Sequence, residues 1–470
     1  MSVKLPLKLS LVMALLYAGQ TLLAQDSTKT QLTDSLSKKT IASPLDTVKP
    51  AVKPEEKKNV LTISVDMRTR TELRHGYRVI PKEDTSAAFF TNQRTRLNFD
   101  FKTKGFDFYA SLQDTRVWGQ QDPREGQGTP TPTDSTTYPL YLFEIYAEPH
   151  FNDKWSVRIG RQRIIYDNQR LFAENDWRLP ANSHDAVRFI YNNKINFTTE
   201  LTAAYNQYGE SNFTTNYKTV GFANYKTLLV HYLNWKMSKN FTLTTINTGD
   251  GYQTSAKPST KTFMRYTSGG RLEFSSYSWY LTFSGYYQYG KDSAGKKLGA
   301  YYIQPEIKFS GIKNLAIRLG MEYMSGQDTL NSKDNNFVPL YGVAHRFMGN
   351  MDFFATFPGD LNNGGIVNPY LFFQYQNKKV TVRFENHLFY SQSNAAFKGK
   401  GVMDEYLGFE SDWRLNYKPV PFIDIESGFC WASVTKSMLV VKKSDGDTKA
   451  FPYFFYLSLR FTPTIGKFSF

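Results

Sequence analysis

One irregular stretch of the chain concentrates side chains that could do chemistry. Residues 160–186 read GRQRIIYDNQRLFAENDWRLPANSHDA and combine arginines, carboxylates, a histidine and a tryptophan. Two kinds of chemistry use such a set. A histidine between carboxylates can support general acid–base hydrolysis, whereas a loop of mixed charge can select and steer charged solutes in a pore.

A hydrolase built on this stretch would use Asp176, His184 and Asp185. A nucleophilic triad also needs a positioned serine, and Ser183 is adjacent to His184, so their side chains point apart on an extended chain. There is no glycine-rich phosphate loop. A metal site is disfavoured because no two histidines stand at ligand spacing, the six being His75, His150, His184, His231, His345 and His387. We therefore expect no enzyme, no cofactor and no metal, and keep a hydrolase as the alternative from another class.

The first 24 residues predict export across the inner membrane. Lys4 and Lys8 precede the apolar run LSLVMALLYAG and form a short basic segment. Ala24 is the small residue that a signal-peptide cleavage before Gln25 requires. The run is too short for a spanning helix. We interpret residues 1–24 as a signal peptide.

Residues 25–59 have a different composition. From Asp26 onward they are rich in Lys, Ser, Thr and Pro and contain no aromatic residue. Such a segment cannot bury enough apolar surface to offset its ordering entropy, so we expect a disordered periplasmic leader that could contact periplasmic proteins. A helix in the Lys/Glu run is the alternative, and Pro50 and Pro54 oppose it.

Residues 60–470 show hydropathy of period two. In VLTISVDMRTRTELR, Leu61, Ile63 and Val65 alternate with polar residues, and QRTRLNFDFKTK and KNLAIRLGMEY repeat the pattern. Turn signals such as KTKG, YNNKIN, MSKN and QNKK separate these runs. No window approaches 18 continuous apolar residues, which excludes helical spans. The single cysteine, Cys430, excludes an intrachain disulfide.

Alternating strands are typical of a soluble β-sandwich or of a transmembrane β-barrel. Three features favour the barrel: runs of about 10 residues, aromatic residues near strand ends, and connections that alternate between short and long. The 470 − 59 = 411 residues, at roughly 22 per strand with loops, predict an all-β antiparallel barrel of about 18 strands, with 16 or 14 as alternatives, short periplasmic turns and long extracellular loops. The ending PYFFYLSLRFTPTIGKFSF resembles the signal of bacterial barrel-assembly machinery, with Phe461 or Phe470 as the strand end.

The polar face of these strands is rich in arginine. The net charge is +15, and guanidinium groups pair carboxylates bidentately. Acids are interleaved on the same face, so cross-strand ladders that rigidify the wall are the alternative for each arginine. Their collective excess predicts an anion-conducting pore. Eight arginines fall on the polar face by parity: Arg68, Arg70, Arg74, Arg94, Arg96, Arg158, Arg188 and Arg318.

The stretch GRQRIIYDNQRLFAENDWR followed by SHDA resembles the signature of the alginate-export family of outer-membrane porins, in its Bacteroidetes-type branch. TRTELRHGYR, NQRTRLNFDF and LYGVAHRFMGNMDFF add to the resemblance, which spans about residues 60–470. It implies an 18-stranded barrel whose arginine-lined constriction conducts an acidic polysaccharide. One departure is Pro180-Ala181-Asn182, where the family pattern has a Gly-Arg pair. By resemblance, the constriction loop region contains Arg161, Arg170, Asp176, Arg178, His184 and Asp185.

These observations together predict an outer-membrane channel of a Gram-negative bacterium. Its solutes would be anionic, with acidic polysaccharide or oligosaccharide as the leading class and a general or small-anion porin as the alternative. We expect the constriction loop to be fixed by internal ion pairs, such as Arg170 with Asp167 or Asp176. The expected partners are outer-membrane lipid, the barrel-assembly machinery and the anionic solute. Nucleic acid is excluded as a partner by the predicted outer-membrane location.

Overall fold

The computed structural model describes residues 59–119, 140–207, 210, 212, 225–253, 262–327, 333–400 and 403–470. The predicted signal peptide, and the predicted leader except for its last residue, lie outside the described residues. No helix in the described part of the chain is long and apolar enough to cross a membrane.

Strands dominate the described residues and form a single antiparallel sheet. They are β1 (Val60–His75), β2 (Ala88–Lys102), β3 (Phe106–Val117), β4 (Leu140–Pro149), β5 (Trp155–Gln162), β6 (His184–Asn192), β7 (Phe197–Tyr205), β8 (Thr227–Lys236), β9 (Phe241–Tyr252), β10 (Phe263–Ser275), β11 (Trp279–Lys291), β12 (Lys297–Ile312), β13 (Leu315–Met324), β14 (Ile366–Gln376), β15 (Val380–Ser391), β16 (Tyr406–Tyr417), β17 (Ile423–Val434), β18 (Tyr453–Phe461) and β19 (Thr464–Ser469). The short helices are η1 (Gly359–Leu361), η2 (Asn394–Phe397) and α2 (Lys436–Lys442).

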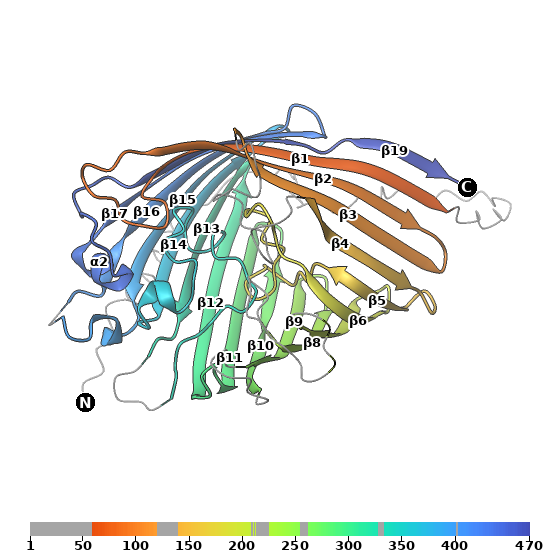
Figure 1. Cartoon of the computed structure of the whole chain (residues 1–470), viewed down its shortest axis with the longest axis horizontal. Helices are drawn as coiled ribbons and strands as arrows, with labels where there is room; N and C mark the ends of the chain where they lie inside the picture. Colours follow the sequence, from red (N-terminus) through yellow and green to blue (C-terminus); the bar gives the residue numbers. More distant parts are fainter. Residues whose placement is uncertain are drawn as a thin grey trace. The chain divides into compact units, whose positions relative to one another are not determined.

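The sheet closes on itself because β18 pairs with β1 (Figure 1). Beyond Phe461 the chain continues as β19, which pairs with the first residues of β1. Asn59 and Phe470 exchange two backbone hydrogen bonds of 3.1 Å. The barrel therefore has 18 strands with β19 as an extra one, which confirms the predicted fold class and strand number. Both candidate ends are real: β18 ends at Phe461, and the pairing with β1 runs on to Phe470.

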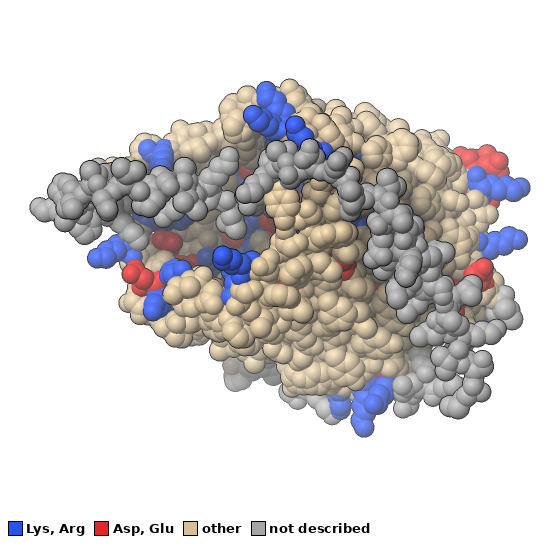
Figure 2. All heavy atoms as spheres, turned by 180° about the vertical axis from the view of Figure 1, so that it is seen from behind, with Lys and Arg blue, Asp and Glu red and all other residues tan. Residues whose placement is uncertain are grey.

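The wall carries its apolar side chains outside and its polar ones inside. In β11, Phe283 is 52% exposed while the neighbouring Thr282 and Ser284 are buried. This is the inverse of a soluble sheet and is typical of a wall that faces lipid. On the face drawn in Figure 2, the described wall is mostly uncharged, and the charged side chains gather toward its margins. The sandwich alternative is thereby excluded.

Connections alternate in length along the chain. Turns such as 193–196 and 313–314 are tight, whereas connections such as 163–183 and 325–365 are long. Asn59, which precedes β1, and Phe470, which follows β19, pair with each other at the short-turn end of the barrel. In outer-membrane barrels the short turns face the periplasm and the long loops face outward.

Candidate functional site

Two long connections enter the barrel and contact each other there. We call residues 163–183 inner loop A and residues 333–365 inner loop B. Phe172 and Tyr341 form a parallel β-bridge between the loops, and the Tyr341 N–H donates to the Leu171 carbonyl at 2.9 Å. Both aromatic side chains are buried. The two loops therefore form one packed body inside the ring of strands (Figure 1).

Inner loop A is held to the wall through Asp176. Arg94 Nη1 lies 2.7 Å and Arg96 Nη1 3.1 Å from Asp176 Oδ1. Arg68 Nη1 donates to the Asp176 carbonyl at 2.6 Å, and Arg460 Nη1 lies 3.5 Å from the carboxylate. Burial alone would raise the pKa of Asp176, but the charges of Arg94, Arg68 and Arg96 outweigh it and hold that pKa well below its usual range. Asp176 is therefore a permanently charged anchor.

A stack of three side chains ties inner loop A to the wall and to inner loop B. The Arg70 guanidinium lies 3.9 Å from the centre of the Trp177 ring, and it donates to the Trp177 carbonyl at 2.8 Å. The opposite partner is His345, whose ring is 3.9 Å away at 11°. His345 Nδ1 in turn lies 2.9 Å from Asp352 Oδ1. Burial lowers the pKa of His345, and Asp352 offsets this only in part.

Inner loop B is held by acids and amides of the wall. Asp412 Oδ2 accepts the Asn350 N–H at 2.9 Å, and Glu410 Oε1 accepts the Met351 N–H at 2.7 Å. Asn368 Nδ2 donates to the Phe347 carbonyl at 2.9 Å. These contacts fix the loop backbone at several points.

Arg170 joins inner loop A to both inner loop B and the opposite wall. Its Nε lies 2.9 Å from Glu322 Oε1 on β13, and its Nη1 donates to the Val343 carbonyl at 2.9 Å. Both charged side chains are fully buried. The predicted pairing of Arg170 with Asp167 or Asp176 was wrong, because the partner comes from a strand 152 residues further along the chain.

Arg161 and Asp185 do not lie in the constriction loop, and this prediction also requires correction. Both belong to strands, β5 and β6, and stand directly opposite each other. They face outward and form a two-pronged ion pair, with Arg161 Nε to Asp185 Oδ1 at 2.9 Å and Nη2 to Oδ2 at 2.8 Å. The alternation explains this, since Arg158 points inward and a residue three positions later must point outward.

The GRQ and HDA pieces of the signature are thus the paired ends of β5 and β6. Gly160 opposes Ala186, and Gln162 opposes His184. Gly160 has φ +125°, and a Cβ there would overlap the carbonyl oxygen of Ile145, so only glycine fits. The signature in this region builds the wall from which inner loop A departs.

The three residues of the hydrolase alternative do not meet. His184 is buried and faces inward, with Nδ1 3.0 Å from the Tyr225 hydroxyl. Asp185 faces outward, and Asp176 is occupied by arginines. Nothing in this arrangement aligns an acid, a base and a nucleophile.

The Pro180-Ala181-Asn182 departure closes inner loop A on itself. Asn182 N–H donates to the Glu174 carbonyl at 2.7 Å, and its side chain donates to the Ala173 carbonyl at 3.0 Å. Ala181 and Asn182 are buried. Ala181 has φ 56°, a conformation that glycine adopts more readily. An arginine in this buried position would need a partner for its charge.

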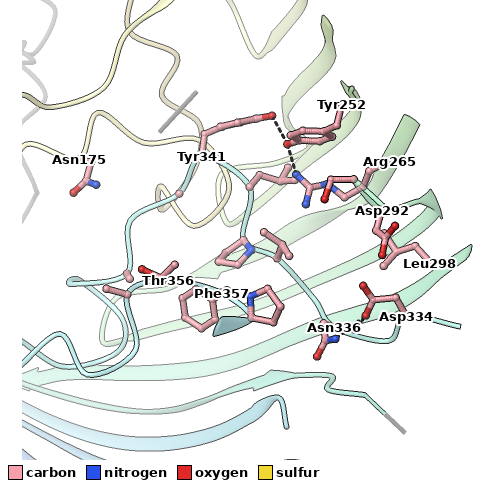
Figure 3. Close-up of a pocket in the computed structure, with 18 of the residues that line it drawn as sticks. Asn175, Tyr252, Arg265, Asp292, Leu298, Asp334, Asn336, Tyr341, Thr356 and Phe357 are labelled. Carbon is pink, nitrogen blue, oxygen red and sulfur yellow. Dashed lines mark hydrogen bonds between the residues drawn. The ribbon is translucent and has the colours of Figure 1, made fainter. Parts of the chain in front are cut away.

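The remaining predicted arginines face inward with acids beside them. Arg178 lies in inner loop A and lines a cavity of about 940 Å³ between the two loops and the wall (Figure 3). The others have acidic neighbours on the wall. Arg158, Arg188 and Arg318 pair across strands, as the ladder alternative describes, whereas Arg74 pairs with an acid of its own strand. These pairs are Arg74 with Glu72, Arg158 with Glu148, Arg188 with Glu200, and Arg318 with Glu306 at 3.7 Å.

Sequence reasoning missed Arg346 on inner loop B. Its side chain is exposed within the described structure. Desolvation by the surrounding protein lowers the pKa of Arg346, and the positive charges of Arg318, Arg414 and Arg383 lower this pKa further, while the carboxylate of Glu385 offsets part of the shift. Strand parity could not find Arg346 because it lies in a loop, although its segment LYGVAHRFMGNMDFF carried part of the family resemblance.

The outward pair Arg161–Asp185 makes a prediction for stability. Asp185→Leu leaves a lone guanidinium on the lipid-facing wall, which costs up to about 2–4 kcal/mol. The double variant Arg161→Leu/Asp185→Leu should recover most of this loss, because an apolar pair can replace an ion pair in low dielectric. Urea unfolding in lipid bilayers measures both. Equal stability of the single and double variants would contradict this assignment.

The comparisons with known proteins agree with the geometry. The family model described as alginate export matches residues 59–425. The Acinetobacter baumannii proteins OccAB2 and OccAB1 are 12% and 11% identical, with TM-scores of 0.57 and 0.58. The matches cover 86% of this chain and 98% and 97% of theirs. The Pseudomonas aeruginosa outer membrane protein opdK is 9% identical, with a TM-score of 0.55, covering 87% of this chain and 99% of its own. No curated protein matches.

At such low identity the solved structures share the fold alone. The family match is independent of them and covers well over half of the 470 residues. Together with the closed barrel, the apolar outer wall and the two inner loops, it places the protein in the outer membrane as a channel. The chain belongs to the alginate export family.

Proposed function

We propose that this channel passes anionic solutes, with acidic polysaccharide or oligosaccharide as the leading class. The observation that carries this proposal is the recurrence of directly opposed, inward-facing cations on neighbouring strands. Like charges directly opposite each other destabilise a sheet. Because such pairs recur, we infer that they have a function that outweighs their cost to stability. The pairs are Arg68 with Arg94, Arg158 with Arg188, Lys308 with Arg318, and Arg383 with Arg414.

The acids inside the barrel offset these cations unevenly. Around Asp176 and Asp66, four arginines share two carboxylates. Arg94, Arg96 and Arg460 each lie within 3.9 Å of both acids, and Arg68 lies 3.7 Å from Asp176. Arg318 lies 3.7 Å from its acid, Glu306. A surplus of guanidinium groups in a narrow lumen favours passing anions.

Arg346 is the residue that we assign to contact the solute. It projects from inner loop B, where the backbone is fixed by Asp412 and Glu410. Its charged neighbours are three arginines and one acid, namely Arg318, Arg414, Arg383 and Glu385. A planar guanidinium can hold a carboxylate through two hydrogen bonds. A cation carried by a fixed loop would therefore select carboxylate-bearing solutes by binding them, without any covalent reaction.

Four further proposals accompany this function. They are the Gram-negative origin, insertion by the barrel-assembly machinery, contact of the leader with periplasmic proteins, and the absence of catalysis. The small-anion porin remains the second candidate, because the ladder pairs alone would also suit chloride or phosphate.

The proposal is tested on Arg346 in planar bilayers. Arg346→Glu should shift the reversal potential under a KCl gradient toward cation selectivity and weaken block by a uronic acid oligomer about tenfold or more, since each lost charge-assisted contact is worth about 1.5–3 kcal/mol. Lys154→Glu, the same charge change on an exposed short turn, is the control. Unchanged selectivity and block in Arg346→Glu would refute the role of this residue. Block of the unmodified channel by chloride competitors but not by oligouronate would favour the small-anion porin.

A further inference from the structure

The eight short turns at one end of the barrel have an unbalanced composition. They are 103–105, 150–154, 193–196, 237–240, 276–278, 313–314, 377–379 and 418–422. Seven of them contain lysine, none contains arginine, and Asp153 is the only acid in any of them. The connection 392–405 at the other end differs, because Asp404 and Glu405 accompany Lys398 and Lys400 there. The short-turn end therefore carries lysine that acids do not balance.

Two of the turn lysines have an acid beside them. Lys418 Nζ lies 3.3 Å from Asp424 Oδ2, and Lys154 follows Asp153 in the chain. The other six are exposed, and no described residue forms an ion pair with any of them. They stand on five turns spaced around the barrel. We call these six residues the basic rim: Lys104, Lys194, Lys239, Lys313, Lys378 and Lys379.

Turn geometry does not require lysine at these positions. Asn193 Oδ1 accepts the Asn196 N–H at 3.0 Å, and Asn377 Oδ1 accepts the Lys379 N–H at 2.9 Å. Lys194 has a left-handed φ of 64°, which asparagine and glycine adopt more readily. Because asparagine already shapes these turns, the property that lysine adds is its charge.

A belt of backbone hydrogen bonds fixes the position of the rim. The last carbonyl of each short turn accepts an N–H from the neighbouring hairpin, at 2.8 or 2.9 Å. The Lys236 N–H, for example, donates to the Asn196 carbonyl at 2.8 Å and joins the turns of Lys194 and Lys239. The rim lysines therefore start from fixed backbone positions. The donors in chain order are His150, Asn192, Lys236, Ser275, Ser310, Gln376, Lys418 and Thr462.

Exposed aromatic rings stand beside the short turns and share the outward parity of the apolar wall. Such a girdle marks the boundary between the hydrocarbon of a membrane and its headgroups. The rim lysines follow within a few residues, so they lie at the level of the headgroups. The rings within two residues of a short turn are Phe106, Trp155, Trp235, Phe241, Trp279, Tyr375 and Tyr417.

The arrangement of the basic rim favours a lipid leaflet as its occupant. A protein partner would cover one sector of the barrel, whereas a leaflet surrounds it and meets all five turns. Lysine is a mobile point charge that attracts phosphate without a fixed geometry, which suits headgroups that exchange. The lumen instead uses arginine in fixed pairs, such as Arg188 with Glu200.

We propose that the basic rim binds the anionic headgroups of phospholipids in the periplasmic leaflet. The barrel would then gather anionic phospholipid in preference to zwitterionic phospholipid at its short-turn end, because each lysine near an anionic membrane surface adds to the attraction. This proposal does not depend on which solute the channel passes.

Tryptophan quenching by brominated lipid tests the proposal. The full-length barrel is reconstituted into phosphatidylcholine vesicles that contain either brominated phosphatidylglycerol or brominated phosphatidylcholine. Trp155, Trp235 and Trp279 lie beside the short turns and report on lipid bound there. Phosphatidylglycerol should bind about threefold or more tightly than phosphatidylcholine at low salt, and this preference should fall at high salt.

Two variants with the same change of charge locate the effect. In the rim variant all six residues of the basic rim are changed to Gln, and the preference should fall to about equal binding of the two lipids. The matched control changes six exposed lysines at the long-loop end to Gln and should keep the preference. An unchanged circular dichroism spectrum shows that each variant is folded. The control lysines are Lys291, Lys296, Lys297, Lys398, Lys400 and Lys449.

The outcomes separate this proposal from the proposed function. An unmodified barrel without preference, a rim variant that keeps the preference, or an equal loss in both variants overturns lipid binding by the rim. If the rim variant keeps its lipid preference but weakens block by a uronic acid oligomer added from the short-turn side, the rim is an entrance for solute instead. In each of these cases an anion-selective channel keeps the proposed function.

Discussion

Arg170→Leu is expected to destabilise the folded protein by about 3–5 kcal/mol, the usual cost of breaking a buried ion pair from one side. Arg170 is 1% exposed and Glu322 is fully buried. The substitution leaves the Glu322 carboxylate without its cation and the Val343 carbonyl without its donor. Both inner loops lose the connection that joins them to β13.

Urea unfolding monitored by tryptophan fluorescence measures this loss. The double variant Arg170→Leu/Glu322→Leu is the matched control, because it removes both charges and should regain most of the stability. A second measurement is limited proteolysis, which should cleave inner loop A in Arg170→Leu. If Arg170→Leu unfolds at the urea concentration of the unmodified protein, Arg170 does not anchor the loops.

Asp176→Asn is expected to release inner loop A and to raise the single-channel conductance. The carboxylate is shared by Arg94, Arg96, Arg68 and Arg460, and a neutral amide cannot balance them. Losing this anchor should cost about 3–5 kcal/mol of loop attachment. The freed guanidinium groups should also make the channel more selective for anions.

Planar bilayer recording of Asp176→Asn measures both effects. Asp153→Asn is the matched control, since it removes the same charge from an exposed short turn. The pKa of Asp176 is lowered by its arginines, so the anchor is complete above the ordinary carboxyl pKa of about 3.9 and weakens only as the pH falls below it. The unmodified channel should keep its conductance from pH 7 to about pH 4. Unchanged conductance and selectivity in Asp176→Asn would count against the anchor.

The barrel wall could be predicted from sequence because alternation is a local property. The predicted inward residues Arg68 and Arg94 and the outward Leu61 follow from period two alone, and the chain length gave the strand number. The same rule, extended from Arg158, would have placed Arg161 outward. The family resemblance instead assigned Arg161 to the constriction loop.

The interior of the barrel could not be predicted because its contacts join distant segments. Arg170 and Glu322 are 152 residues apart, and no pattern near either one indicates the other. Arg346 lies in a segment without periodicity. The family resemblance assigned Asp176 and Asp185 to the same constriction loop. It could not distinguish Asp176, which anchors inner loop A, from Asp185, which faces outward.

The charged stretch 160–186 therefore has two separate roles. Its two ends belong to wall strands, which are joined by the Arg161–Asp185 ion pair. Its middle is a loop that Asp176 and Arg170 hold through ion pairs to the wall. Most of its charges are used to hold structure. The function that we propose assigns selection of the solute to cations elsewhere, on inner loop B and on the opposed strand pairs.

The reversal potential of the unmodified channel in a planar bilayer under a tenfold KCl gradient tests the central claim most directly. A lumen with an excess of inward-facing guanidinium groups should pass chloride in preference to potassium, so the reversal potential should take the sign of anion selectivity, and a uronic acid oligomer should block the current where a neutral oligosaccharide of the same length does not. A cation-selective reversal potential would contradict the account.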